Sequence, residues 1–150
     1  MKILLAVDGS SFSDAALEEV ASRPWPANSE VKVLCVAEPP VLPVVETWTP
    51  TGAYFEELEK LAEEQAEKIV RKAAGELQSR QGKNLVITTE IVCGQPRYII
   101  TDEAEEWGAD LIVVGSHGYR GLTKLWLGSV SQTVASHAKC SVEIVRNRKP

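Results

Sequence analysis

Cysteine is scarce in this chain of 150 residues, and its spacing excludes two classes of small protein. The three cysteines, Cys35, Cys93 and Cys140, are odd in number and far apart, and no C-x-x-C pair occurs. A disulfide framework needs an even set of cysteines, and a structural zinc site needs closely spaced ones. Cys35 and Cys93 fall in apolar, strand-like segments and Cys140 just precedes one, so we expect buried, reduced thiols.

Long apolar runs and an excess of positive charge are also missing. No stretch approaches the roughly 18 apolar residues of a transmembrane helix, and no basic, apolar leader follows Met1. The formal net charge is -5 and the mean hydropathy is -0.10, whereas the footprint of a nucleic-acid binder is basic. We therefore expect a single cytoplasmic domain over residues 1–150 that binds neither nucleic acid nor a membrane.

Two common phosphate-binding signatures do not occur in the chain. The Walker A loop needs G-x-x-x-x-G-K-[ST], and no segment has that spacing. The dinucleotide fingerprint needs three glycines after the first strand, where this chain has only Gly9. Gly115, Gly118 and Gly121 form a G-x-x-G-x-x-G series, which is a weak signal by itself.

The chain does contain a regular alternation of apolar runs and amphipathic stretches. The runs predict strands over Ile3–Val7, Val31–Ala37, Leu85–Cys93, Leu111–Val114 and Val142–Val145. The stretches predict helices over Ser11–Ser22, Tyr54–Ser79, Pro96–Trp107 and Ser129–His137. Strands alternating with helices indicate an α/β fold, a parallel sheet with helices on both faces.

The details of these segments predict which of them are buried. The first and fourth strands are continuously apolar, as in strands covered on both faces of a parallel sheet. Threonine and glutamate in the 85–93 strand indicate an edge position. The 54–79 helix carries an apolar stripe that includes Leu61, Ala66 and Leu77, and we expect this stripe to cover the sheet.

Polar residues and glycines follow two of the strands and predict a ligand site there. Asp8 ends the first strand and Gly115 the fourth; in parallel sheets, ligands bind beyond the carboxyl ends of the strands. Gly128 precedes a helix whose first N–H groups, at residues 128–131, would point at an anion, and the hydroxyls of Ser129 and Ser131 can add donors. Asp8 could hold a ribose hydroxyl or a hydrated Mg²⁺, or be a simple turn residue, and Ser129 could equally be a helix N-cap.

The full spacing of these residues is more specific than the glycines alone. The series Gly115-x2-Gly118-x9-Gly128-Ser129 resembles the nucleotide motif of the universal stress protein family, in its ATP-binding branch. The opening Ile3–Ser10 segment and the His137–Cys140 segment are also similar to that family, so the resemblance covers the whole chain. It implies a doubly wound, Rossmann-like fold of the HUP type with five parallel strands in the order 3-2-1-4-5.

The resemblance also implies a set of nucleotide-binding residues and a ligand. ATP would be bound together with Mg²⁺ or Mn²⁺, the metal being held by Asp8 through water. Asp8 matches the acidic residue beside the adenosine, and Val36 a position whose backbone meets the adenine. The complete set is Ala6, Val7, Asp8, Val36, Gly115, Ser116, His117, Gly118, Gly128, Ser129, Val130 and Ser131. His117 is expected to bind or pack rather than to catalyse, and Arg120 and Lys124 could screen phosphates or be solvated surface charges.

The chain departs from the family pattern near its C-terminus. Ser141 stands where many relatives have proline, and Glu143 where they have an apolar residue. In relatives the last strand often pairs across a dimer axis, so the resemblance implies a homodimer through that strand. A charge at position 143 leaves the mode of that dimer open.

These expectations combine into one functional hypothesis with two alternatives. The leading hypothesis is an ATP-binding regulator or sensor in a stress response, not an enzyme, with at most slow ATP hydrolysis. Efficient hydrolysis would need a positioned base and a charge-stabilising group at the γ-phosphate, and no such pair is evident. The alternatives are an ATP-cleaving or adenylyl-transferring enzyme on the same scaffold, and a nucleotide-free interaction protein.

Overall fold

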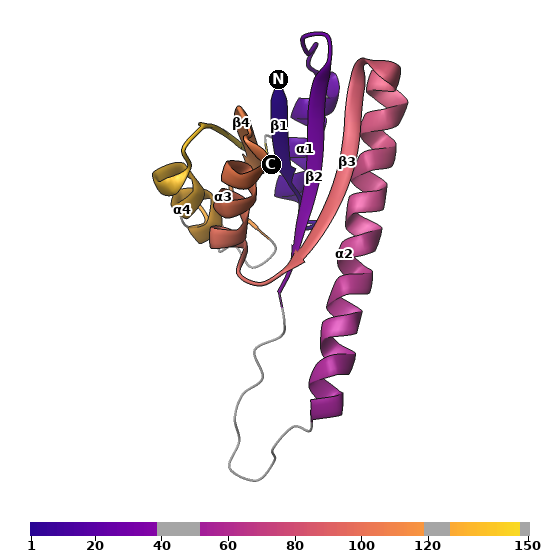
Figure 1. Cartoon of the computed structure of the whole chain (residues 1–150), viewed down its shortest axis with the longest axis vertical. Helices are drawn as coiled ribbons and strands as arrows, with labels where there is room; N and C mark the ends of the chain where they lie inside the picture. Colours follow the sequence, from indigo (N-terminus) through magenta and orange to yellow (C-terminus); the bar gives the residue numbers. More distant parts are fainter. Residues whose placement is uncertain (39–51, 119–126, 148–150) are drawn as a thin grey trace.

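The computed structural model describes residues 1–38, 52–118 and 127–147, as drawn in colour in Figure 1. Five strands form one sheet: β1 (Lys2–Ala6), β2 (Ser29–Ala37), β3 (Leu85–Cys93), β4 (Leu111–Gly115) and β5 (Ser141–Val145). The helices are α1 (Ser11–Ser22), α2 (Gly52–Gln81), α3 (Pro96–Trp107) and α4 (Ser129–His137), with a 3-10 turn, η1 (Gly82–Asn84), after α2. The predicted elements are confirmed, with most boundaries within two residues.

The sheet is parallel throughout, and its strand order is β3-β2-β1-β4-β5. This confirms the doubly wound fold and the order that the family resemblance implied. β1 lies between β2 and β4, with Leu5 opposite Val33 on one side and Val113 on the other. The order reverses beside β1, so the carboxyl ends of β1 and β4 lie next to each other, where open α/β sheets bind their ligands.

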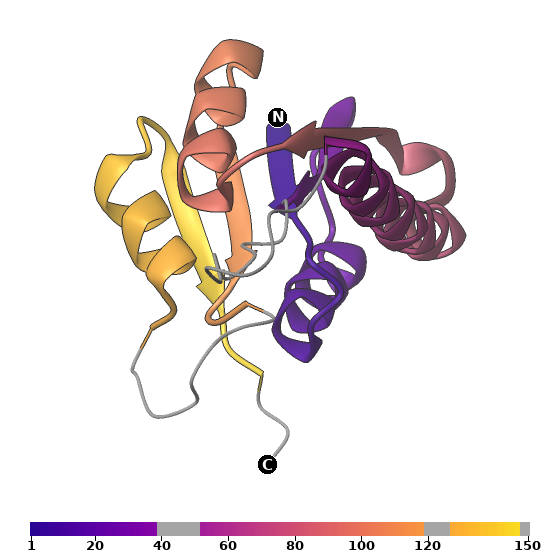
Figure 2. The same cartoon turned by 90° about the horizontal axis from the view of Figure 1, so that it is seen from below.

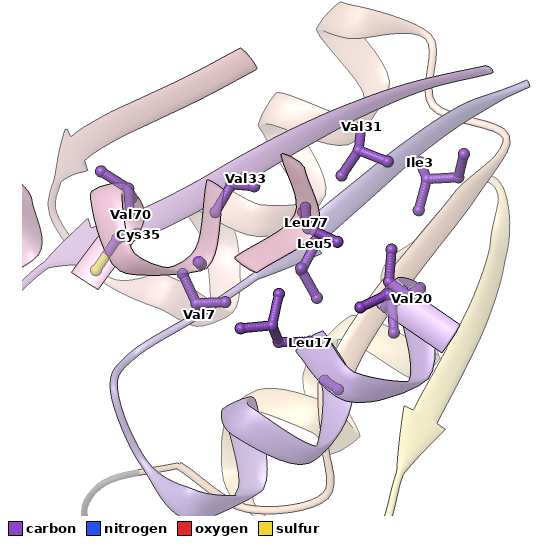
Figure 3. Close-up of a cluster of buried hydrophobic side chains, with 14 of the residues drawn as sticks. Ile3, Leu5, Val7, Leu17, Val20, Val31, Val33, Cys35, Val70 and Leu77 are labelled. Carbon is purple, nitrogen blue, oxygen red and sulfur yellow. The ribbon is translucent and has the colours of Figure 1, made fainter. Parts of the chain in front are cut away.

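Helices cover both faces of the sheet, as Figure 2 shows from below. Alternate side chains of the central strands enter two separate cores. On the face of α1 and α2, Ile3, Leu5, Val31 and Val33 pack with helix residues such as Leu77 (Figure 3). On the face of α3 and α4 the core consists of Leu4, Leu34, Ile100, Ala104, Ile112, Val114 and Val134.

Helix α2 is longer than predicted, and one part of its apolar stripe is not buried. At about 1.5 Å per residue, its 30 residues span roughly 45 Å, whereas the nine residues of β2 or β3 span roughly 30 Å. The helix therefore extends past the strands at its N-terminal end, toward the bottom of Figure 1. Ala66 and Leu77 are buried as predicted, but Leu61 is 55% exposed, so the prediction for Leu61 was wrong.

The cysteines are free, and their burial differs from the prediction. Cys35 is buried in β2, but Cys93 is exposed and Cys140 is half-buried. The prediction failed at Cys93 because β3 is an edge strand, as its threonines and glutamate indicated, and Cys93 is its last residue. The Cys93 thiol donates a hydrogen bond to Glu63 Oε1 at 3.2 Å, and this bond raises the pKa of the thiol.

None of the helices in the described ranges combines the length and apolarity that a bilayer-spanning segment needs.

Candidate functional site

A cavity of about 510 Å³ opens beyond the carboxyl ends of β1, β2 and β4. This volume falls within the range of small-molecule sites, roughly 300–1,000 Å³. Eleven of the twelve predicted site residues line it: Ala6, Val7, Asp8, Val36, Gly115, His117, Gly118, Gly128, Ser129, Val130 and Ser131. Ser116 is the exception. It is buried behind the cavity wall, where its N–H donates to Val145 O at 2.8 Å.

Gly115, the last residue of β4, is required by packing against α1. A Cβ atom added there would lie 2.6 Å from the backbone carbonyl atoms of Phe12, a distance that real Cβ atoms do not reach. The absence of a side chain at Gly115 therefore lets β4 and α1 approach each other. Gly115 also lines the cavity, and its predicted role in nucleotide binding stays a prediction.

Gly118 lies against the carboxylate of Asp8, across the boundary between β4 and β1. A Cβ atom at position 118 would be 3.0 Å from Asp8 Oδ2. The other oxygen, Oδ1, accepts a hydrogen bond from the N–H of Ser10 at 2.9 Å. Asp8 therefore does stabilise its own turn, as the simpler interpretation held, and it also lines the cavity.

The start of α4 is braced against the turn after β4 by two hydrogen-bonded groups. The N–H of Gly128 donates to Ser116 O at 2.8 Å. The buried hydroxyl of Ser131 lies 2.9 Å from both Ser116 O and Gly128 O, and donates to these carbonyls. Two groups that were predicted to face an anion, the Gly128 amide and the Ser131 hydroxyl, are therefore engaged within the protein.

The amides of the next three residues are the ones that α4 offers to the cavity. Ser129, Val130 and Ser131 are the first three residues of the helix, and their N–H groups have no carbonyl four residues back within the helix. All three line the cavity, and Ser129 is exposed. Gly128, not Ser129, is the N-cap, so the N-cap interpretation of Ser129 was wrong and its hydroxyl does not cap the helix. The helix dipole adds partial positive charge at this point.

His117 packs on the wall of the cavity. Its ring centroid lies 5.0 Å from that of Phe12, and its Nδ1 lies 3.2 Å from Ser116 Oγ. These contacts show that the ring of His117 packs against α1; that it does not catalyse stays a prediction. Arg120 and Lys124, the two candidate phosphate-screening residues, lie outside the described residues.

The structure adds two walls that the sequence interpretation missed. From α2, the residues Ala62, Gln65, Ala66 and Ile69 line the cavity, and from the start of α3 come Gln95, Pro96, Arg97 and Ile100. Leu34, Cys35, Ala37, Glu38, Val114 and Ser13 complete it. One signal could have located the α3 wall, because a helix that follows a parallel strand starts at the carboxyl edge of the sheet. The α2 wall depends on how far that helix extends.

Cys35 illustrates the electrostatics of the cavity. Its side chain is only 3% exposed, and burial raises the pKa of the thiol to about 11, with a further contribution from the negative charge of Asp8. Asp8 and Glu38 are the carboxylates that line the cavity among the described residues, and Arg97 is the one basic side chain there apart from His117. The described residues contain no cluster of three His, Cys, Asp or Glu side chains that could hold a metal ion without other ligands.

The fold is a doubly wound α/β fold with a cavity at the carboxyl ends of its strands, and comparison with known sequences identifies the family. The model of the universal stress protein family matches residues 1–146. The chain is 32% identical to the universal stress protein YxiE of Bacillus subtilis, over 97% of this chain and 98% of that protein. The chain belongs to the universal stress protein family.

Solved structures support the same assignment. The fold is similar to that of the universal stress protein UspA from Lactobacillus plantarum, with a TM-score of 0.74 and 25% identity over 97% of each chain. It is also similar to a universal stress protein of Arabidopsis thaliana with AMP bound, with a TM-score of 0.70. That protein is 18% identical over 99% of this chain and 92% of its own, so the likeness to it concerns the fold.

Proposed function

We propose that the cavity binds an adenine nucleotide, with ATP as the main ligand, and that the protein acts as a nucleotide-dependent regulator in a stress response. The observation that carries the proposal is the start of α4. Three consecutive backbone amides without helical acceptors, those of Ser129, Val130 and Ser131, belong to residues that line the cavity. A helix start of this kind is a ready-made site for a phosphate group.

The rest of the cavity accommodates the other parts of a nucleotide. Asp8, which lies against the turn at Gly118 and lines the cavity, is suited to accept hydrogen bonds from ribose hydroxyls. The apolar side chains of Val36, Ile69 and Ile100 provide contact area for a base. The AMP bound to the Arabidopsis protein of the same fold supports this class of ligand. The motif Gly115-x2-Gly118-x9-Gly128-Ser129 supports the ATP-binding branch.

A divalent ion would be bound with the nucleotide rather than before it. Asp8 and Glu38 supply carboxylate oxygens, the ligands that Mg²⁺ and Mn²⁺ prefer, but two carboxylates are fewer ligands than either ion needs. Phosphate oxygens and water would complete the coordination. We therefore expect Mg²⁺ to strengthen ATP binding and to have little affinity for the protein alone.

The proposed role is binding and not catalysis. Asp8 Oδ1 accepts a hydrogen bond from the Ser10 N–H, and His117 packs beside Phe12, which supports structural and binding roles for both residues. We expect ATP turnover well below about 1 s⁻¹, the lower end of ordinary enzymes. A turnover above that value in freshly purified protein would favour the alternative, an ATP-cleaving enzyme on this scaffold.

The experiment that tests the proposal identifies the nucleotide directly. Freshly purified protein is denatured, and any released nucleotide is identified by mass spectrometry; the stripped protein is then titrated with MgATP, MgADP, AMP and MgGTP by calorimetry. The expected result is a 1:1 complex with adenine nucleotides and no comparable binding of MgGTP. If none of these ligands binds, the nucleotide-free alternative is correct and the proposal fails.

We also propose that the protein forms a homodimer through β5, which is an edge of the sheet. The structure shows how the unusual Glu143 is accommodated. Its two carboxylate oxygens accept hydrogen bonds from the Arg23 guanidinium at 2.7 and 2.8 Å, and Arg23 also contacts Glu19 at 2.6 Å. Because the charge is paired within one chain, it does not oppose pairing of two β5 edges. Sedimentation analysis checks this, and a monomer at micromolar concentration would contradict it.

A further inference from the structure

The N-terminal half of α2 carries apolar side chains that face solvent. Phe55 is 44% exposed, Leu61 is 55% exposed and Tyr54 is 37% exposed, while Leu58 is partly exposed. We call these four residues the exposed stripe, to distinguish them from the buried apolar face of the same helix. Positions 54, 58 and 61 follow the four- and three-residue steps of one helix face, with 55 beside them, so the side chains form a continuous strip about two turns long.

The stripe continues from the buried face of the helix but lies beyond the sheet. Ala66, Val70, Ala73 and Leu77 are buried against the strands, whereas the stripe belongs to the part of α2 that extends past them in Figure 1. A sheet-covering helix has no need of large apolar side chains after the sheet has ended. Contiguous exposed apolar side chains of this kind mark interaction surfaces.

The charges around the stripe indicate what kind of partner it fits. Residues 52–67 contain six glutamates and a single lysine, which gives this half of the helix a net charge of -5, from six negative charges and one positive. On a helical projection, Glu57 and Glu64 border the stripe on one side, and Glu59 and Glu63 border it on the other. The surface is therefore an apolar strip between two acidic borders.

We propose that residues 52–67 of α2 are a docking surface for a basic amphipathic helix of another protein. The leucines and aromatic residues of the stripe supply apolar contacts at helical spacing, and the glutamates pair with lysines or arginines that flank the apolar face of the partner. A second copy of this chain is the less suitable occupant, because stripe-to-stripe pairing would bring two acidic borders together.

The docking surface is adjacent to the nucleotide cavity but does not depend on it. Ala62, Gln65, Ala66 and Ile69 line the cavity from the same helix, within one or two turns of the stripe. A partner on the stripe would therefore contact the helix that forms one wall of the cavity. The four residues of the stripe and the glutamates beside them do not line the cavity, so the inference holds whether or not the cavity binds ATP.

The test uses a defined peptide probe and the whole chain. The probe is a labelled 18-residue peptide of leucine and lysine, with leucines at helical i, i+3, i+4 and i+7 positions, and its control is a scrambled peptide of the same composition. Binding is measured by fluorescence anisotropy at low and physiological salt. We expect saturable binding of the amphipathic peptide, weaker binding of the scrambled one and no binding of a version with glutamate in place of lysine.

Substitutions separate apolar docking from simple charge attraction. Leu61→Glu adds an attractive charge for the basic peptide, yet removes a central apolar contact, and we expect it to weaken binding by about tenfold. Val86→Glu is the matched control: Val86 is 57% exposed near the start of β3, next to the C-terminal end of α2, and the same charge change there should leave binding unchanged. Phe55→Ser should weaken binding in the same way, and circular dichroism confirms that each variant is folded.

Three results would overturn the proposal. The first is equal binding of the peptide to the Leu61→Glu variant and to the original chain, which would mean non-specific charge attraction. The second is equal binding of the scrambled and amphipathic peptides. The third is that sedimentation shows a dimer that Leu61→Glu converts to monomers while the peptide does not bind, which would assign the stripe to a second copy of the chain.

Discussion

Two glycines of the Gly115-x2-Gly118-x9-Gly128-Ser129 motif have different neighbours in the structure, although the spacing alone does not distinguish them. Gly115 faces the backbone of Phe12, and Gly118 faces the end of the Asp8 side chain. Backbone cannot move aside without shifting a helix, whereas a carboxylate can rotate. Substitution at the two positions should therefore affect different properties of the protein.

Gly118→Ala is expected to weaken nucleotide binding and to leave the fold intact. The new methyl group would push Asp8 Oδ2 from its position at 3.0 Å, and the carboxylate would no longer be aligned with the ribose. We expect the affinity for MgATP to fall by about tenfold or more, while the free energy of unfolding changes by less than about 1 kcal/mol. Calorimetric titration and urea denaturation measure the two quantities. Unchanged affinity would show that Asp8 does not contact the ligand.

Gly115→Ala should instead destabilise the protein. A Cβ atom 2.6 Å from the Phe12 carbonyl group forces β4 and α1 apart, and overpacking of this kind costs about 1–3 kcal/mol. Urea denaturation of the variant, with Gly75→Ala as a control at a site where a Cβ meets nothing within 4 Å, checks this. Equal stability of the Gly115→Ala variant and the original chain would mean that the contact relaxes without cost.

Cys35 should make stability depend on pH in the alkaline range. Burial raises the pKa of this thiol from 9.0 to about 11, so the folded state holds a proton that the unfolded state releases. The contribution is fully present below about pH 9 and is lost as the pH rises toward 11, up to roughly 2–3 kcal/mol. The measurement compares urea denaturation at pH 8 and pH 11 for the original chain and Cys35→Ala. Identical pH slopes would contradict the assignment to Cys35.

At the scale of the elements, α1 and β5 are joined by the Arg23–Glu143 pair. Two guanidinium nitrogens contact both carboxylate oxygens, and hydrogen bonds to Glu143 and Glu19 raise the pKa of Arg23 further above its usual range. Since about a third of each side chain is exposed, the pair is partly screened by solvent.

A double-mutant cycle with Arg23→Gln and Glu143→Gln measures this pair. We expect a coupling free energy of about 0.5–1.5 kcal/mol, above that of an ordinary surface pair because the contact is bidentate. The coupling should decrease when the salt concentration is raised. A value near zero at low salt would mean that the pair does not hold β5 against α1.

The elements were predictable from the sequence where local patterns decide them. The continuous apolar runs of β1 and β4, the threonines and glutamate of β3, and Gly108 are local features of the sequence, and each has a physical effect on its own element. Gly108 ends α3 in a left-handed conformation, with φ 69°, which glycine adopts without steric cost. The length of α2 relative to the sheet was not predictable in this way, because it depends on where the strands end in space. That is why Leu61 was wrongly expected to be buried.

At the scale of the whole molecule, the two halves of the sheet contribute jointly to the cavity. Asp8 follows β1 and Val36 lies in β2, whereas Gly118 follows β4 and Ser129 begins α4. A ligand that contacts both halves binds the folded state alone, so it must stabilise folding as a whole.

Saturating MgATP should therefore raise the melting temperature. At 100 times the dissociation constant, linkage gives about 2.7 kcal/mol, which corresponds to roughly 5–10 °C for a domain of this size. Thermal denaturation with MgATP, and with MgGTP as the control, measures the effect. No shift at millimolar MgATP would contradict the proposed nucleotide site.

The sequence by itself determined the class of fold and the segments that form it, because apolar periodicity is a local property of the chain. Its resemblance to the universal stress protein family supplied eleven of the residues that line the cavity. Only the tertiary structure decided how those residues are used. Ser131 and the Gly128 amide are engaged with backbone carbonyls, Gly115 makes room for α1, and the end of α2 lies outside the sheet. These roles depend on which atoms from distant parts of the chain occupy the neighbouring space, and no local pattern records that.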